Sequence, residues 1–153
     1  MPLTRMFARF FLWAFKSLDA IPVYRNNPRS LIKTFRITID AMQAGDNLLL
    51  FPERGDNLGP GDKGYAEEGI GELYTGFAMI APALYKKAHK AAVFVPVYAS
   101  KKLKTLTFGK GIAFNPSAPV NDENKRIVTA LHTRIGAMVE DEQKAWQKLQ
   151  AKA

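Results

Sequence analysis

Apolar residues recur along this chain with two different periods, and the two periods predict different elements. A spacing near 3.6 residues favours helices, and the second such helix has sequence signals at both ends. Asn27 and Pro28 suit its first turn, whereas Gly45 suits its end. The last predicted helix has Asp122 and Glu123 in its first turn, where carboxylates stabilise the helix dipole. The helices predicted in this way cover residues 3–18, 28–44, 72–90 and about 121–149.

Short and nearly continuous apolar runs predict strands that are buried on both faces. Strands and helices alternate along much of the chain, which is typical of an α/β sheet covered by helices. We therefore predict an α/β fold with a mixed, largely parallel sheet flanked by helices, in a single domain of residues 1–153. The predicted strands are residues 20–25, 47–51, 91–100, 105–108 and 111–114.

Composition narrows the range of partners. The net charge of +8 favours an anionic partner: a nucleic acid, a membrane surface or a phosphorylated small molecule. The chain has no cysteine, and its two histidines, His89 and His132, are far apart in sequence. We therefore expect neither a disulfide nor a metal site. No apolar run approaches the roughly 20 residues of a membrane-spanning helix.

The first predicted helix is rich in phenylalanine and has a narrow basic face. Arg5, Arg9 and Lys16 fall on that face, and apolar side chains cover much of the remaining circumference. Two interpretations are open: an ordinary core helix, or a helix that lies in the headgroup region of a membrane. In the second case these three cations contact lipid phosphates.

The stretch "NLLLFPERGDN" places charged residues directly after a predicted buried strand. In open α/β sheets, ligands bind just beyond the strand ends. Glu53, Arg54 and Gly55 occupy that position, and a long glycine-rich loop of residues 52–71 follows the strand. Loops of this length in a compact domain are usually functional or mobile. We therefore predict a ligand-binding site here.

The chain contains four short blocks in order: "IPVYR" (21–25), "LLLFPERG" (48–55), "TGFAMIAPAL" (75–84) and "VFVPVYA" (93–99). Taken together, they resemble those of the glycerophospholipid acyltransferase superfamily, which includes the lysophosphatidate (1-acylglycerol-3-phosphate) acyltransferases of phospholipid biosynthesis. The resemblance implies transfer of a fatty acyl group from acyl-CoA or acyl-carrier protein to a lysophospholipid hydroxyl. It implies no cofactor and no metal, a peripheral position on the cytoplasmic face of an anionic membrane, and no nucleic-acid partner.

The resemblance also suggests roles for individual residues. By family position, Arg25 would hold the acceptor phosphate, which suits the planar fork of a guanidinium. Glu53 would orient the acceptor or its arginine. The chain departs from the family pattern after Glu53, where Arg54 and Gly55 precede an aspartate instead of Gly-Thr-Arg. Thr75 also stands where the family commonly has a lysine.

The family's catalytic His-x-x-x-x-Asp motif is not present in this sequence. Five residues after His89 stands Phe94, and five residues after His132 stands Ala137. We therefore assign no catalytic residue. In the family the motif precedes the "IPVYR" block, so we expect a partial acyltransferase domain, truncated at the N-terminus. Its motif-bearing core is about 19–116, followed by the C-terminal amphipathic helix at about 121–149.

Two other functions compete with the acyltransferase hypothesis. The first is a non-catalytic membrane- or lipid-binding remnant of the same family. The second is a basic nucleic-acid-binding protein. The second is disfavoured, because the aromatic residues lie in apolar stripes rather than among basic residues.

Overall fold

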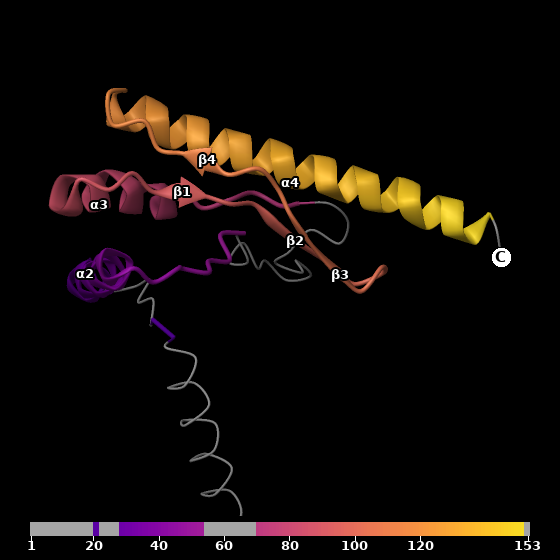
Figure 1. The fold of residues 1–153 in the computed structure, drawn as a ribbon, viewed down its shortest axis with the longest axis horizontal. Helices are drawn as coiled ribbons and strands as arrows, with labels where there is room; N and C mark the ends of the chain where they lie inside the picture. The colour runs from indigo at the N-terminus through magenta and orange to yellow at the C-terminus, as the bar shows by residue number, and fades with distance from the viewer. Residues whose placement is uncertain (1–19, 22–27, 54–69, 152–153) are drawn as a thin grey trace, which may run out of the picture. The chain divides into compact units, whose positions relative to one another are not determined.

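The computed structural model describes residues 20–21, 28–53 and 70–151, which belong to two compact units. Met1–Leu48 forms one unit, and Leu49–Ala153 forms the other. The predicted helix at residues 3–18 and most of the predicted strand at residues 20–25 lie outside the described residues. Figure 1 shows the described elements in colour.

The described part of the first unit is dominated by helix α2, Pro28–Ala44. Both of its predicted ends are confirmed. Gly45 adopts a left-handed conformation with φ of 109°, which glycine reaches without steric cost. Its amide donates to the Met42 carbonyl at 3.2 Å, and the Asp46 amide donates to the Ala41 carbonyl at 3.1 Å. This pair of hydrogen bonds is a Schellman motif, which satisfies carbonyls at the helix end.

The strand predicted at residues 47–51 is wrong, because these residues form no strand. Leu49 is 69% exposed and Phe51 is 85% exposed, so the apolar run is not buried. Just after this run, Glu53 forms an isolated antiparallel bridge with Leu73. An apolar run predicts burial, but a strand also requires a neighbouring strand to pair with.

Residues 70–151 contain four short strands: β1 (Val93–Phe94), β2 (Val97–Ser100), β3 (Thr105–Phe108) and β4 (Ile112–Ala113). They form two two-stranded antiparallel sheets, β1 with β4 and β2 with β3. The predicted mixed, largely parallel sheet is therefore wrong for the described residues. The physical reason is the short connection at residues 101–104, since parallel strands require a crossover of a dozen residues or more.

The two sheets are consecutive parts of one bent antiparallel ribbon. Residues 95–96 lie opposite residues 109–111, so the second strand has one extra residue at the break. Such an insertion is a β-bulge, which bends the ribbon. Pro96 has no amide hydrogen to donate, but its carbonyl accepts the Gly109 amide at 2.9 Å. The strand predicted over residues 91–100 is thus divided at its proline.

The helix predicted at residues 72–90 is shorter and has two parts. A 3₁₀ turn, η1 (Gly76–Met79), leads into helix α3 (Ile80–Ala88). Pro82 lies in the first turn of α3. A first-turn residue has no intrahelical partner for its amide, so proline is tolerated there.

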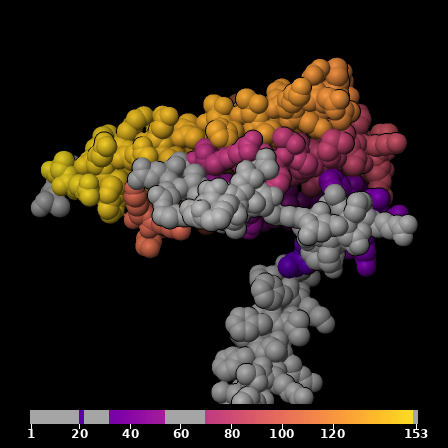
Figure 2. Space-filling view, turned by 180° about the vertical axis from the view of Figure 1, so that it is seen from behind, coloured from indigo at the N-terminus to yellow at the C-terminus, as the bar shows by residue number. Residues whose placement is uncertain are grey.

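Helix α4, Val120–Gln150, confirms the predicted last helix and runs along the ribbon (Figure 1). It contacts η1, β2 and β4. In the space-filling view, this orange-to-yellow helix lies directly against the magenta segment that follows residue 70 (Figure 2). The buried apolar side chains of α4 are Ile127, Leu131 and Val139.

An ion pair between the buried Glu123 carboxylate and the half-exposed Arg126 fixes the start of α4 to β4. The carboxylate of Glu123, 2% exposed, accepts hydrogen bonds from Arg126 Nε at 2.7 Å and Nη2 at 2.6 Å. Arg126 Nη2 also donates to the Ala113 carbonyl at 2.7 Å, and the Asn115 amide donates to Glu123 at 2.7 Å. The hydrogen bond from Arg126 is the main cause that lowers the pKa of Glu123.

The bulge predicts opposite effects for two glycine substitutions. A Cβ atom at Gly109 would lie 2.8 Å from Pro96 Cγ and would also clash with the end of Met138. Gly109→Ala should therefore lower the free energy of unfolding by about 1–3 kcal/mol. A Cβ atom at Gly136, inside α4, would have open space around it, with nothing to meet within 4 Å. Gly136→Ala should raise the free energy of unfolding by roughly 0.5–1 kcal/mol.

Urea denaturation of both variants beside the parent chain measures these changes. A Gly109→Ala variant as stable as the parent would contradict the bulge geometry.

Candidate functional site

Glu53 is the predicted site carboxylate that the structure describes. It lies where residues 52–53 pair with residues 73–74. The Tyr74 amide donates to the Pro52 carbonyl at 2.8 Å, and Glu53 and Leu73 form the adjacent bridge. The Gly71 amide donates to Oε1 of Glu53 at 2.7 Å. The backbone and the side chain of Glu53 are therefore both held in place by contacts with residues 71–74.

Gly71 permits this contact because it has no side chain. A Cβ atom at position 71 would lie 2.6 Å from Oε1 of Glu53 and 3.3 Å from its Cγ. Any larger residue would have to displace the carboxylate or the backbone. The half-buried Glu53 carboxylate thus has a defined position that depends on a glycine eighteen residues further along the chain.

Among the predicted binding residues, Glu53 alone belongs to the part of the chain that the structure describes. Thr75, where the family commonly has a lysine, is exposed just before η1. The predicted acceptor-binding and membrane-contact residues Arg25, Arg54, Gly55, Arg5, Arg9 and Lys16 lie outside the described residues.

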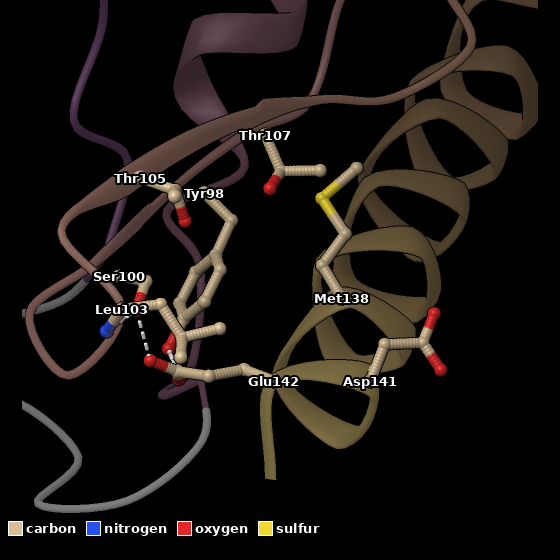
Figure 3. Close-up of a pocket in the computed structure, with 8 residues that line it drawn as sticks. All are labelled: Tyr98, Ser100, Leu103, Thr105, Thr107, Met138, Asp141 and Glu142. Atoms are coloured by element: carbon tan, nitrogen blue, oxygen red, sulfur yellow. Dashed lines mark hydrogen bonds between the residues drawn. The ribbon is translucent and has the colours of Figure 1, made fainter. Parts of the chain in front are cut away.

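A second polar cluster, which the sequence pattern did not predict, lies between the ribbon and α4. It lines a hollow of about 200 Å³ (Figure 3). Side chains of β2, β3 and the turn between them face Met138 and Glu142 of α4 across this hollow. The lining residues are Tyr98, Ser100, Leu103, Thr105, Thr107, Met138, Asp141 and Glu142.

Glu142 is the centre of this cluster and is 8% exposed. The Ser100 hydroxyl donates to its Oε1, and the Tyr98 hydroxyl donates to its Oε2 (Figure 3). The backbone amide of Lys102 is a further donor to the same carboxylate. Ser100 Oγ in turn accepts the Leu103 amide at 2.7 Å. The carboxylate therefore ties the β2–β3 turn to α4.

The surroundings of the cluster shift the pKa values of Glu142 and Tyr98 in opposite directions. The bonds from Ser100 and then Tyr98 favour the charged form of Glu142 and lower its pKa. Burial raises the pKa of Tyr98 to about 12, and the Glu142 carboxylate adds to the effect. At neutral pH the pair is a neutral phenol that donates to an ionised carboxylate.

The chemistry of this cluster is that of an anchor rather than of a nucleophile. The Ser100 hydroxyl has a donor and an acceptor partner within the chain, and no histidine lines the hollow. A nucleophilic serine requires an adjacent base that can take up and release its proton. The lowered pKa of Glu142 makes it a poor base. We therefore assign the cluster a positioning role.

The sequence did contain a signal for Glu142. The apolar stripe of the last helix continues through Ile135, Met138 and Trp146, and position 142 lies within this spacing. Its neighbours Glu140 and Asp141 make the segment resemble a solvated acidic face. The signal for this cluster was the position of the carboxylate on the apolar stripe. A charged residue that is buried there requires hydrogen-bonding or ionic partners.

The described residues contain no group of three or more potential metal ligands. None of their helices combines the length and hydrophobicity that crossing a bilayer requires.

Comparison of the chain with models of protein families, with curated proteins and with solved structures gives no match.

The Glu142 cluster predicts an acid-sensitive contribution to stability. The pKa of Glu142 is lowered from an ordinary value of 4.5, so this contribution to stability is present above that value. It is lost as the pH falls through the folded-state pKa of Glu142. Glu142→Gln should lower the free energy of unfolding by roughly 1–3 kcal/mol at pH 7, because buried hydroxyls lose their charged acceptor. The difference from the parent chain should shrink below pH 4.

The matched control is Asp141→Asn. The Asp141 side chain is 81% exposed, and its carboxylate points away from the Tyr98 and Ser100 hydroxyls (Figure 3). It should change the free energy of unfolding by less than about 0.5 kcal/mol. Urea titrations between pH 3 and 8 measure both variants. A Glu142→Gln penalty that is constant over this range would contradict the assigned ionisation.

Proposed function

We propose that this chain is the acceptor-binding part of a glycerophospholipid acyltransferase. The acceptor is a lysophospholipid, the donor is a fatty-acyl thioester, and the chain acts at the cytoplasmic face of a membrane. The ordered blocks that contain Arg25, Glu53 and Pro96 support this proposal. The observation that carries it is the fixed position of the Glu53 carboxylate, in the block where the family has its acceptor-orienting glutamate.

The proposed division of labour follows from the chemistry of the acceptor. Arg25 pairs with the phosphate through its planar guanidinium, which forms two parallel hydrogen bonds to phosphate oxygens. Glu53 orients that arginine or the glycerol hydroxyls, and the Gly71 amide holds Glu53 in place. Fixing a binding group in advance lowers the entropic cost of binding.

Acyl transfer itself requires a group that the proposed site does not supply. The acceptor oxygen attacks the thioester carbonyl, a C–O bond forms, the C–S bond breaks and the thiolate leaves. The hydroxyl proton must pass to a base, and a positioned base typically contributes 10²–10⁴-fold. The family's His-x-x-x-x-Asp motif, which provides that base, is not present in these 153 residues.

This absence favours a second candidate function for the 153-residue chain: binding of lipid without catalysis. The two candidates share the same acceptor site and differ in turnover. A thioester-release assay with acyl-CoA and lysophosphatidate separates them. We expect acceptor binding with acyl transfer at background, whereas clear acyl transfer would show that the chain does supply a base.

The acceptor site makes a prediction about Gly71 and Arg25. Gly71→Ala displaces the Glu53 carboxylate without changing any charge, because the new Cβ would lie 2.6 Å from Oε1. It should weaken binding of a short-chain lysophosphatidate, measured by calorimetry below its micelle concentration. Arg25→Ala should weaken binding by roughly 10- to 100-fold, and Arg25→Lys should restore it only partly.

The matched controls leave the proposed site intact. Gly76→Ala adds the same methyl group where no atom lies within 4 Å, and Arg36→Ala removes an exposed cation from α2. Both variants should bind like the parent chain. Monoacylglycerol, which has no phosphate, should bind weakly to all variants. Unchanged lysophosphatidate affinity in Arg25→Ala and Gly71→Ala would refute the proposed acceptor site.

A further inference from the structure

The β2–β3 hairpin has two chemically different faces. Residues alternate between the faces of a strand, and cross-strand partners share a face. The pairs Tyr98–Thr107 and Ser100–Thr105 face α4, because all four of these residues line the hollow (Figure 3). The remaining pairs, Val97–Phe108 and Ala99–Leu106, must therefore lie on the opposite face.

That opposite face is apolar and largely uncovered. We call Val97, Ala99, Leu106 and Phe108 the apolar hairpin face. Leu106 is 64% exposed and Phe108 is 68% exposed, while Ala99 is also exposed and Val97 is half-buried. Scattered exposed apolar residues are normal on proteins, but a face made wholly of them indicates an interaction surface.

The turn that closes the hairpin is basic. We call Lys101, Lys102 and Lys104 the lysine tip, and all three residues are exposed. Lys104 adopts a left-handed conformation with φ of 55°, which closes the turn. In the space-filling view the salmon end of the hairpin stands out at the surface beside α4 (Figure 2). Cations and apolar side chains are thus adjacent on one exposed hairpin.

We propose that the β2–β3 hairpin docks on an anionic lipid bilayer, with the apolar hairpin face in the interface and the lysine tip on lipid phosphates. Interfacial membrane-binding elements combine buried apolar area with attraction to anionic headgroups. A nucleic acid would complement the lysine tip, but it would leave the leucine and phenylalanine in water. The bilayer complements both features.

The anchor described above makes this arrangement rigid. Glu142 accepts hydrogen bonds from the Tyr98 and Ser100 hydroxyls, and therefore holds the polar face of the hairpin towards α4. The apolar face is then directed away from α4 without any rearrangement. The hairpin is a different part of the chain from the acceptor site, and its docking does not depend on the proposed acyl transfer.

Vesicle co-sedimentation of the full 153-residue chain tests the role of the lysine tip. The vesicles contain equal parts of phosphatidylglycerol and phosphatidylcholine, with pure phosphatidylcholine as the neutral comparison. Each lysine near an anionic surface contributes about five-fold to binding. Lys101→Ser, Lys102→Ser and Lys104→Asn combined should weaken binding roughly 100-fold if the effects add. Asparagine is chosen at position 104 because it tolerates the left-handed conformation.

The matched charge control removes three exposed lysines of α4: Lys125→Ser, Lys144→Ser and Lys148→Asn. It has the same net charge as the lysine-tip variant and should bind much more tightly. Equal weakening of both triple variants would show that net charge alone drives binding, and it would overturn the proposal.

A site-specific label tests the apolar hairpin face. The chain has no cysteine, so a single Ala99→Cys can carry an environment-sensitive dye. Its emission should shift to the blue on anionic vesicles, whereas a dye at the exposed Glu140→Cys on α4 should not shift. The double variant Leu106→Ser/Phe108→Ser should weaken vesicle binding. The control Val120→Ser/Leu149→Ser changes two α4 residues that are 42% and 54% exposed, and it should weaken binding less.

Other outcomes identify a different surface or partner. Binding that is lost in Arg5→Ser/Arg9→Ser/Lys16→Ser but kept in the hairpin variants would assign membrane contact to the N-terminal segment and overturn the inference. Tighter binding to random DNA than to anionic vesicles at equal salt would also overturn it. Neither result changes lysophosphatidate binding, so the proposed acceptor site is tested separately. Thermal unfolding of each variant must match the parent chain within a few degrees.

Discussion

Glu142 accepts hydrogen bonds from the Tyr98 and Ser100 hydroxyls and so ties the β2–β3 hairpin to α4. A buried carboxylate is costly unless its oxygens have donors, and the hairpin supplies donors from two side chains and the Lys102 amide. Side chains alternate between the two faces of a strand, so once Tyr98 and Ser100 face α4, Ala99 must face away from it. A single buried carboxylate thus determines which chemistry the exposed face of the hairpin presents.

The part of the fold that the sequence predicted correctly is the part with local signals. Helix α2 has Pro28 at its start and Gly45 after its end, and both signals act within one turn of the chain. Helix α4 has Asp122 and Glu123 in its first turn and a long apolar stripe. Glu53 does have a fixed position in the structure, but its partner Gly71 has no side chain to suggest a role.

The sheet was predicted wrongly because strand pairing is not a local property. Residues 47–51 have the composition of a buried strand, yet among the described residues no strand pairs with them, and Phe51 is exposed. The break between strands at residues 101–104 was predicted, but not its hairpin turn, because Lys104 takes the left-handed conformation that glycine or asparagine usually marks. The bulge opposite Pro96 adds one residue to the second strand, which disturbs the simple alternation.

The face assignment of the hairpin supports both the positioning role of Glu142 and the proposed membrane surface, and nuclear Overhauser effects test it directly. In the isotopically labelled 153-residue chain, we expect contacts between the backbones of Ala99 and Leu106, which are register partners. We also expect contacts between the Thr107 and Met138 methyl groups, which line the same hollow. Contacts from Leu106 or Phe108 to Met138 instead would contradict the account, because they would place the apolar face against α4.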